Sequence, residues 1–385
     1  MRIALIRQKY TPFGGAERYM ARLVEGLAAE GHEVHILAAQ WDAGGEAAVT
    51  LHRVPVVKKP GWLKALTFSL GCKKIIARER FDVVFSLERT LSQDVYRAGD
   101  GCHRQWLRQK QLGRGLLSRL VTYLNPIQLA YLRLERGLFT DPGLKAIIAN
   151  SRAGKAEIVK LYGVDPEKIH VVYNGIDAAS FPQEERGQYR ESLAREYGLS
   201  GELRILYVGS GFARKGVPAL IEAVALLQIP FTLFVVGKGR SGALERRVRR
   251  LAPAGRVVFT GPVRDVERFY LGCDLFVFPT LYDPFSNATL EAMACGLPAI
   301  TSRFNGVAEL IEEGKSGFVL QDPLDAGEIA RCITRLAEEK LRLEMGRGAR
   351  LAVQELTMVR NSRESLAVLE KVMQGAQAGL PGGSS

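Results

Sequence analysis

The chain has 385 residues, of which 47% are hydrophobic and 24% charged, and its formal net charge is +12. This is the composition of an ordinary globular protein, and the length suits two domains of under about 200 residues each. No apolar run reaches the roughly 18 residues that a membrane span requires, and Met1–Lys9 predicts a first β-strand and no signal peptide. Five scattered cysteines without CxxC spacing favour reduced, structural thiols over a disulfide framework.

Short β-rich runs alternate with helical patterns along the chain, which predicts parallel sheets joined by crossover helices. Strands of the first half are expected at Arg2–Arg7, Glu33–Ala38, Leu51–Val57, Phe81–Leu87, Lys145–Ala149 and Ile169–Tyr173. Those of the second half are expected at Arg204–Val208, Phe231–Val236, Arg256–Thr260, Asp274–Pro279, Pro298–Thr301 and Gly317–Leu320. Helices are expected between them, for example at Ala16–Glu30, Val217–Leu227 and Asn287–Ala294. The two halves are therefore interpreted as two copies of one α/β architecture.

This pattern predicts the division of the chain. We expect an N-terminal domain at 1–177 and a C-terminal domain at 184–358, joined by a linker that begins at Asn174 and runs through Gln183. A helix at 359–376 is expected to return to the N-terminal domain. The residues 377–385 predict a disordered tail, because they end in Gly, Pro and Ser.

The positive charge is concentrated in the first half. Residues 1–180 carry 27 Lys and Arg against 17 Asp and Glu, whereas residues 181–385 carry 26 against 24. The segment 103–136 holds seven Lys and Arg, one acid (Glu135), and interleaved Leu, Trp and Tyr. Such a basic amphipathic segment can lie on an anionic membrane, and the alternative is a pair of surface helices with solvated arginines. The excess favours a polyanionic partner, which could be nucleic acid, a membrane or a phosphorylated glycolipid.

Glycine-rich turns follow the first strand of each half. Gly14 and Gly15 lie between a predicted strand and helix, where backbone amides can approach a phosphate, although a plain turn fits the residues equally. Arg214 and Lys215 lie in the corresponding turn of the second half, Gly209–Gly216. That is the carboxyl end of a predicted strand, where α/β proteins bind ligands. Two adjacent cations there predict a diphosphate site, with a solvated Arg-Lys pair as the alternative.

Two acids flank the start of the helix predicted at 287–294. Asp283 and Glu291 are eight residues apart, and the amides around Ser286 and Asn287 are placed to bind an anion. A carboxylate inside that helix can accept both hydroxyls of a ribose. Considered singly, Glu291 could be a helix-surface acid and Asp283 a turn residue before Pro284.

Together these motifs resemble the retaining glycosyltransferases of family 4, which have the GT-B fold. The matching stretches are Pro12–Gly15, Asp94–Asp100, Gly209–Gly216, Phe259–Gly261 with Asp265 and Val266, and Asp283–Gly296. The resemblance covers nearly the whole chain, and it is strongest to the enzymes that add glucose to an inner-core heptose of lipopolysaccharide. It implies an α/β protein of two Rossmann-like domains that face each other across a cleft.

The resemblance implies roles for single residues. Gly14 and Gly15 would meet the phosphate or sugar of a nucleotide-sugar donor, Arg214 and Lys215 would hold its diphosphate, and Glu291 would bind its ribose.

Further roles follow from the same resemblance. Asp283 would bind a hydroxyl of the transferred sugar, although the family usually has Glu there, whose carboxylate reaches about 1.5 Å further. The amides of Ser286 and Asn287 would contact the donor. Asp100 falls where the family places a polar residue near the reacting sugar, and His103 is a second candidate.

The reaction implied is a transfer with retention of configuration, in which the departing phosphate takes the proton of the acceptor hydroxyl. The sequence contains no Asp-x-Asp, so Arg214, Lys215 and helix amides would replace a metal ion, and no cofactor is expected beside the donor. The expected donor is UDP-glucose, with UDP-galactose and UDP-N-acetylglucosamine as alternatives. The expected acceptor is an anionic glycolipid or polysaccharide, reached from the inner face of the cytoplasmic membrane by peripheral attachment through residues 103–136.

Two other functions compete with this interpretation. Gly237–Gly242 matches the GxGxxG fingerprint of dinucleotide-binding oxidoreductases, but the following predicted strand, Arg256–Thr260, lacks the terminal acid that the fingerprint requires. A non-enzymatic membrane- or polyanion-binding protein would fit a pI near 9.5. The sequence holds no recognisable nucleic-acid module, and simple polyanion binding does not explain the paired glycine-rich turns.

Overall fold

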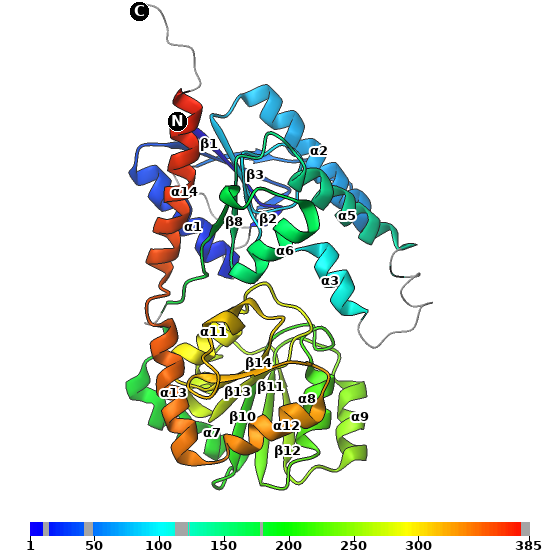
Figure 1. Ribbon diagram of the computed structural model, residues 1–385, viewed down its shortest axis with the longest axis vertical. Helices are drawn as coiled ribbons and strands as arrows, with labels where there is room; N and C mark the ends of the chain where they lie inside the picture. Colours follow the sequence, from blue (N-terminus) through cyan, green and yellow to red (C-terminus); the bar gives the residue numbers. More distant parts are fainter. Residues whose placement is uncertain (11–14, 42–48, 112–121, 123, 178–179, 379–385) are drawn as a thin grey trace, which may run out of the picture. The chain divides into compact units, whose positions relative to one another are not determined.

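A computed structural model of the chain describes residues 1–10, 15–41, 49–111, 122, 124–177 and 180–378. These residues form two compact units (Figure 1). The first unit comprises Met1–Tyr173 and the C-terminal helix that starts at Met358, and the second comprises Asn174–Thr357.

The first unit is built on a seven-stranded parallel sheet with the order β5-β3-β1-β6-β7-β8-β9. Its strands are β1 (Arg2–Ile6), β3 (Glu33–Ala38), β5 (Val49–Arg53), β6 (Val83–Ser86), β7 (Val95–Arg97), β8 (Ala146–Ala149) and β9 (Ile169–Val171). Its helices are α1 (Gly15–Ala29), α2 (Gly61–Glu79), α3 (His103–Lys110), α5 (Pro126–Phe139), α6 (Arg152–Tyr162) and α14 (Met358–Ala378). A separate pair joins β2 (Lys9–Tyr10) to β4 (Gln40–Trp41).

Both faces of this sheet are covered by helices, so its central strands are apolar on both sides. Successive residues of a strand point to opposite faces. Ile3 and Leu5 of β1 accordingly pack into one core with α1 and α14, whereas Ala4 and Ile6 pack into another that includes Phe68 of α2. The last helix of the chain therefore completes the core around the first strand.

Two strands of this sheet differ from the prediction. β5 spans Val49–Arg53, so the predicted strand at Leu51–Val57 is wrong over its second half. Pro55 has no amide hydrogen for a neighbouring strand, which ends regular pairing before it. β7 was not predicted, because three residues between polar neighbours give too little alternation to detect.

The second unit repeats the plan with a six-stranded parallel sheet of order β12-β11-β10-β13-β14-β15. Its strands are β10 (Leu203–Val208), β11 (Phe231–Val236), β12 (Arg256–Gly261), β13 (Leu275–Phe278), β14 (Ala299–Ser302) and β15 (Gly317–Leu320). Its helices are α7 (Arg186–Tyr197), α8 (Val217–Val224), α9 (Gly242–Leu251), α10 (Glu267–Gly272), α11 (Asn287–Ala294), α12 (Ala326–Arg335) and α13 (Glu339–Val353). All six residues of β11 are buried, as in a sheet covered on both faces.

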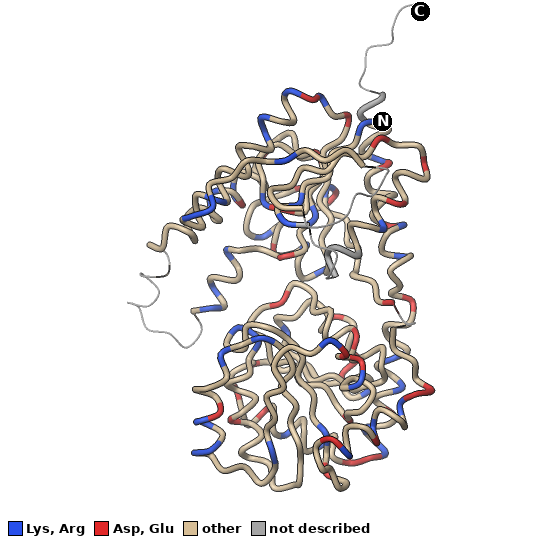
Figure 2. The backbone as a smooth tube through the Cα atoms, turned by 180° about the vertical axis from the view of Figure 1, so that it is seen from behind, with Lys and Arg blue, Asp and Glu red and all other residues tan. Residues whose placement is uncertain are grey.

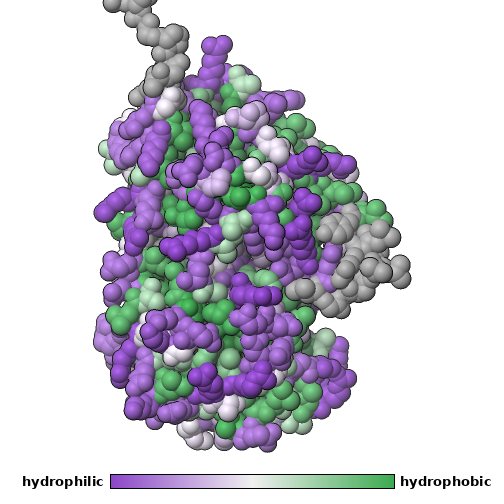
Figure 3. All heavy atoms as spheres, viewed as in Figure 1, coloured by the Kyte–Doolittle hydropathy of each residue, from purple (hydrophilic) through white to green (hydrophobic). Residues whose placement is uncertain are grey.

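The surface and the cysteines agree with an ordinary globular chain. Hydrophilic and hydrophobic residues are interspersed on the face seen in Figure 3. In the part of the chain described, no helix combines the length and apolarity that crossing a membrane requires. All five cysteines are free thiols, four of them buried, as the sequence predicted. Of the predicted tail at 377–385, Gln377 and Ala378 are the last two residues of the helix α14, and the other seven lie outside the described residues.

Candidate active site in the second unit

The predicted site residues of the second unit gather at one edge of its sheet. Strand order reverses at β10, which lies between β11 and β13. Ligands of open parallel sheets bind outside the carboxyl ends of the strands at such a reversal. The turn Gly209–Gly216 follows β10, and the loop that contains Asp283 follows β13. The topology thus brings together two motifs that are 68 residues apart.

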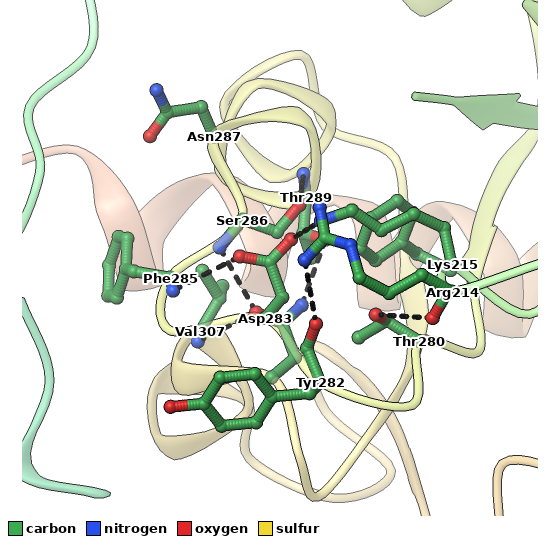
Figure 4. Close-up of polar contacts among 12 residues, drawn as sticks. Arg214, Lys215, Thr280, Tyr282, Asp283, Phe285, Ser286, Asn287, Thr289 and Val307 are labelled. Atoms are coloured by element: carbon green, nitrogen blue, oxygen red, sulfur yellow. Dashed lines mark hydrogen bonds and ion pairs between the residues drawn. The ribbon is translucent and has the colours of Figure 1, made fainter. Parts of the chain in front are cut away.

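The first turn approaches the β13 strand end so closely that it requires a glycine. Gly216 has φ +82°, and a Cβ atom there would lie 1.8 Å from the Pro279 carbonyl oxygen. Across this contact, the Arg214 guanidinium donates to the Tyr282 carbonyl at 3.1 Å, and the Leu281 amide donates to the Arg214 carbonyl at 3.0 Å. Arg214 and Lys215 are therefore held against the second loop (Figure 4).

Lys215 and Asp283 form a nearly buried ion pair. The ammonium of Lys215 donates to Oδ2 of Asp283, and the two side chains are only 10% and 11% exposed. The ammonium also lies 5.1 Å from the centre of the Phe278 ring. Burial lowers the pKa of Lys215, and the Asp283 carboxylate opposes that change. Asp283 is thus the counterion of a buried lysine at this sheet edge, and its charge favours the protonated ammonium.

A buried asparagine locks the Asp283 loop onto the start of α11. Oδ1 of Asn305 accepts from the amides of Ser286 (3.1 Å) and Val307 (3.2 Å). Its Nδ2 donates to the hydroxyls of Thr289 (3.1 Å) and Thr301 (3.0 Å). With both ends of its amide engaged, Asn305 fixes the backbone around the helix N-terminus.

The hydroxyl of Ser286 caps α11 by accepting from the Thr289 amide at 3.2 Å. Asp283 adds a second turn contact, because its Oδ1 accepts from the Phe285 amide at 3.2 Å. Asn287 is exposed, and its side chain points away from the Lys215–Asp283 pair (Figure 4). Its Oδ1 accepts from the side-chain Nδ2 of Asn174 at 2.8 Å.

Glu291 lies one turn further along α11 and is half-buried. The hydroxyl of Tyr270, on α10, donates to Oε2 of Glu291 at 3.0 Å. Burial raises the pKa of Tyr270, so the phenol keeps the proton that it donates. The bond fixes the orientation of the Glu291 carboxylate.

The sequence of the second unit, residues 202–339, matches the family description "Glycosyl transferases group 1", and residues 13–180 match "Glycosyltransferase Family 4". The chain belongs to the family 4 glycosyltransferases. It is 27% identical over 356 residues to the lipopolysaccharide glucosyltransferase WaaG of Escherichia coli (strain K12), covering 91% of this chain and 93% of that protein. It is 26% identical to the N-acetyl-alpha-D-glucosaminyl L-malate synthase of Bacillus anthracis, covering 90% of this chain and 91% of that protein.

Solved structures agree with this assignment. The crystal structure of WaaG, a glycosyltransferase involved in lipopolysaccharide biosynthesis, superposes with a TM-score of 0.79. The two sequences are 26% identical, and the match covers 94% of this chain and 99% of that one. The glycosyltransferase therefore has the GT-B fold of two Rossmann-like units, as the sequence predicted.

The dinucleotide fingerprint at Gly237–Gly242 has a packing explanation in this glycosyltransferase. Gly237 has φ +132°, and a Cβ atom on it would lie 2.2 Å from the Gly209 carbonyl oxygen. A Cβ atom on Gly239 would lie 2.3 Å from the Phe212 ring. These glycines let the strand-to-helix turn after β11 support the turn that carries Arg214 and Lys215.

The candidates of the first unit lie at the carboxyl end of its own sheet. Gly14 lies outside the described residues, and Gly15 is the first residue of α1. Asp100 follows β7, is 73% exposed at its side chain, and lies 3.8 Å from the Arg89 guanidinium. Nε2 of His103 lies 2.7 Å from Oε1 of Gln128. Burial, followed by the positive charge of Arg89, lowers the pKa of His103, which favours the neutral imidazole.

The 103–136 segment divides into α3 and α5, with residues 112–121 and 123 between them outside the described part. Its single acid, Glu135, is fully buried. The Glu135 carboxylate accepts from the amides of His103 and Arg104, from the Tyr162 hydroxyl, and from Arg89. It therefore holds the N-terminus of α3, the helix on which His103 lies. A negative charge is favourable there, because the N-terminal end of a helix dipole is positive.

Sequence reasoning missed three residues of these sites: Glu135, Tyr270 and Asn305. Asn305 precedes a glycine in a loop, which is a turn signal, but nothing local marks its contact with Ser286. The described residues contain no group of three or more His, Cys, Asp or Glu side chains that could hold a metal ion.

Proposed function

We propose that this glycosyltransferase moves a hexose, with glucose as the first choice, from a UDP-sugar to an anionic glycolipid or polysaccharide of the cell surface. The similarity to the E. coli lipopolysaccharide glucosyltransferase, over nearly the whole of both chains, supports glucose and a lipopolysaccharide-core acceptor. The N-acetyl-alpha-D-glucosaminyl L-malate synthase is almost as similar to this chain, at 26% identity, and its name gives a different sugar and a different acceptor. The donor and acceptor are therefore the first things to test.

The observation that carries the proposal is the pair of adjacent cations at the strand reversal, of which Lys215 is buried and Arg214 half-buried. Lys215 has one counterion among the described residues, Asp283, and Arg214 lies beside it with the N-terminus of α11 across the loop. A diphosphate would gain the charge of both side chains and the amides of α11. A buried hydroxyl below the turn supports a polar ligand here, because the Tyr207 hydroxyl has no hydrogen-bond partner in the described structure.

The proposed reaction retains the configuration of the transferred sugar. The bond between the anomeric carbon and the diphosphate oxygen breaks, and the acceptor oxygen bonds to that carbon on the same face. The acceptor proton passes to the departing phosphate oxygen, so that no protein base is required. Arg214, Lys215 and the α11 amides stabilise the leaving diphosphate in place of a metal ion. Glu291, oriented by Tyr270, binds the ribose hydroxyls, and Asp283, Asp100 and His103 complete the sugar side of the site.

The test is to replace Arg214 and Lys215 singly by Ala. Each replacement should lower the rate of transfer from UDP-glucose by about 10²–10³, by analogy with loss of an oxyanion-hole donor. The thermal midpoint should change much less. The matched control is Arg249→Ala, which removes an exposed arginine of α9. Transfer that stays within about twofold in both site variants would place the diphosphate elsewhere.

Calorimetry with UDP-glucose, UDP-galactose and UDP-N-acetylglucosamine ranks the donors, and anomeric analysis of the product tests retention.

We also propose peripheral attachment to the inner face of the cytoplasmic membrane through residues 103–136. Arg104, Arg108, Arg133 and Arg136 are exposed on α3 and α5, and Leu124 between these helices is 64% exposed. Each cation near an anionic surface contributes about 1 kcal/mol, and salt screens that contribution.

Vesicle co-sedimentation across a salt series tests this attachment. Replacement of Arg104, Arg108, Arg114 and Arg119 by Gln should release the protein from phosphatidylglycerol vesicles and leave UDP-sugar hydrolysis intact. The control replaces four exposed arginines of the second unit, Arg195, Arg246, Arg249 and Arg250. Binding that ignores salt, or that falls equally in both variants, contradicts a role for this segment.

A further inference from the structure

The first unit contains a groove that the transfer reaction does not use. It lies between the edge strand β5, the residues that follow it, and one side of α2, and its volume is about 820 Å³. Volumes of roughly 300–1,000 Å³ are typical of small-molecule sites. Two contacts join the residues after β5 to α2 and so fix the two walls of the groove relative to each other. The Val57 amide donates to the Thr67 hydroxyl at 3.1 Å, and Gly71 of α2 lies against Val54, where a Cβ atom would be 2.6 Å from the Val54 side chain.

Much of the groove wall is aliphatic, and the groove is open to solvent, with His52, Thr67 and Arg78 among its polar lining. Leu51 is 44%, Val57 43% and Leu70 55% exposed, and Ile75 also lines the groove. These three are among only nine large hydrophobic side chains classed as exposed in the described residues, so they are concentrated at this place. Hydrophobic side chains exposed together mark binding surfaces more often than single ones. A nucleotide or free sugar, which requires many polar partners, fits such a wall poorly.

Cations stand on both walls of this groove. Arg53 on β5 and Lys74 on α2 are exposed, and among the described residues neither side chain forms a hydrogen bond or ion pair. The surrounding segment, residues 51–80, has eight Lys and Arg and one acid, Glu79. Figure 2 shows this excess of basic over acidic positions along α2. An anionic group bound here would meet charge from two elements at once.

An added β-strand is a poor occupant, although β5 is the edge of the sheet. The strand is five residues long and is followed by Pro55, and short edge strands with charges and prolines resist pairing. A free fatty acid would fill the groove without contacting the exposed Lys58, Lys59 and Lys73 around it. A lipid still embedded in an anionic bilayer would fill the groove and also bring the bilayer surface close to these three lysines.

We propose that the β5–α2 groove binds one anionic phospholipid of a bilayer, with its phosphate between Arg53 and Lys74 and an acyl chain along Leu51, Val57, Leu70 and Ile75. This site is separate from the donor site and does not depend on the proposed transferase reaction. It also lies outside residues 103–136, although α2 packs along α5 of that segment (Figure 1).

Binding of a single lipid separates this site from general attraction to a charged surface. Calorimetry on the full chain uses dihexanoyl-phosphatidylglycerol below its micelle concentration, without nucleotide sugar. We expect saturable binding, and much weaker binding of dihexanoyl-phosphatidylcholine and of inorganic phosphate. Arg53→Gln with Lys74→Gln should raise the dissociation constant by about tenfold or more, as expected for two lost charge-assisted contacts. The control, Lys58→Gln with Lys73→Gln, removes the same charge from beside the groove and should leave the dissociation constant within about twofold of the unchanged protein's.

Leu70→Glu provides an independent variant, because this exposed residue can change without disturbing the core. It should abolish lipid binding while thermal unfolding stays like that of the unchanged protein. No binding of the phosphatidylglycerol monomer overturns the proposal, as does equal binding of phosphatidylcholine. Equal loss in the two double variants, or inorganic phosphate binding as tightly as the lipid, overturns it as well. A protein that elutes at twice its mass and reverts with Leu70→Glu would assign the groove to a second copy of the chain.

Discussion

The candidate sites of the two units differ in how their buried charged side chains are paired. In the first unit the buried group is an anion, Glu135, which accepts from two backbone amides, a phenol and a guanidinium. In the second unit it is a cation, Lys215, with one carboxylate partner. A buried charge whose bonding capacity is filled by the protein holds structure together, because no capacity is left for a ligand. A buried cation with one partner can still bind an incoming anion.

This difference explains why two units of similar fold differ in their capacity to bind an anion. In the first unit the fixed carboxylate positions the backbone at His103 and leaves Asp100 exposed. In the second, Asn305 fills its hydrogen bonds with the start of α11, with Val307 and with β14. It fixes the backbone around the Asp283 loop, while Lys215, on the turn after β10, retains donor capacity. The side chain that fixes the backbone and the side chain that can bind a ligand thus lie on different loops of the site.

The largest effect should be a loss of stability on substitution of Glu135, the buried carboxylate whose hydrogen-bonding capacity is filled. Glu135→Gln removes the charge and turns an amide donor toward groups that are themselves donors. We expect about 3–5 kcal/mol of lost stability, as when one partner of a buried pair is removed. Chemical denaturation measures it, and the exposed Glu167→Gln is the control. A change as small as that of the control would show that Glu135 is not the anchor of α3.

The next effect should be on ligand binding. Glu291→Gln keeps the size of the side chain but weakens up to two charge-assisted bonds to the ribose, each of about 1.5–3 kcal/mol. The donor KM should rise strongly with little loss of stability. Calorimetry with UDP checks this without the sugar, and unchanged UDP affinity would exclude Glu291 from the ribose site.

Tyr270→Phe should have a smaller effect in the same direction. The variant removes the hydroxyl that orients Glu291, at a cost of about 1 kcal/mol or roughly fivefold in donor affinity. The test is additivity. In Glu291→Gln the Tyr270 substitution should matter less, because two residues acting through one contact are coupled. Full additivity would make Tyr270 a packing residue only.

Asp283→Asn should produce a pH effect and a modest change at neutral pH. Burial already lowers the pKa of Lys215, and loss of the Asp283 charge should lower it further. Diphosphate binding needs the protonated lysine, so affinity is retained at low pH and lost as pH rises through that pKa. The alkaline fall in UDP affinity should therefore begin at a lower pH in the variant. An unmoved alkaline limb would show that Lys215 does not bind the phosphate.

The sequence predicted the architecture because each strand and helix leaves a local pattern. It also predicted the strand-end position of Arg214 and Lys215, since topology alone determines which turns share an edge. The pairing of Lys215 with Asp283 was not predictable, because it depends on side chains 68 residues apart. The buried role of Glu135 was not predicted for the same reason, since its Arg89 partner lies 46 residues earlier in the chain. β7 and the end of β5 were missed where short runs and a proline weaken the alternation.

The return of α14 to the first unit has a consequence for the order in which the protein is made. Val368, Leu369, Val372 and Met373 complete the core around Ile3 and Leu5, yet the whole of the second unit precedes them in the chain. The second unit, Asn174–Thr357, is continuous in the chain and has all its strands and helices before α14 leaves the ribosome. The half synthesised first therefore finishes folding last, and until then its apolar face along α1 remains uncovered.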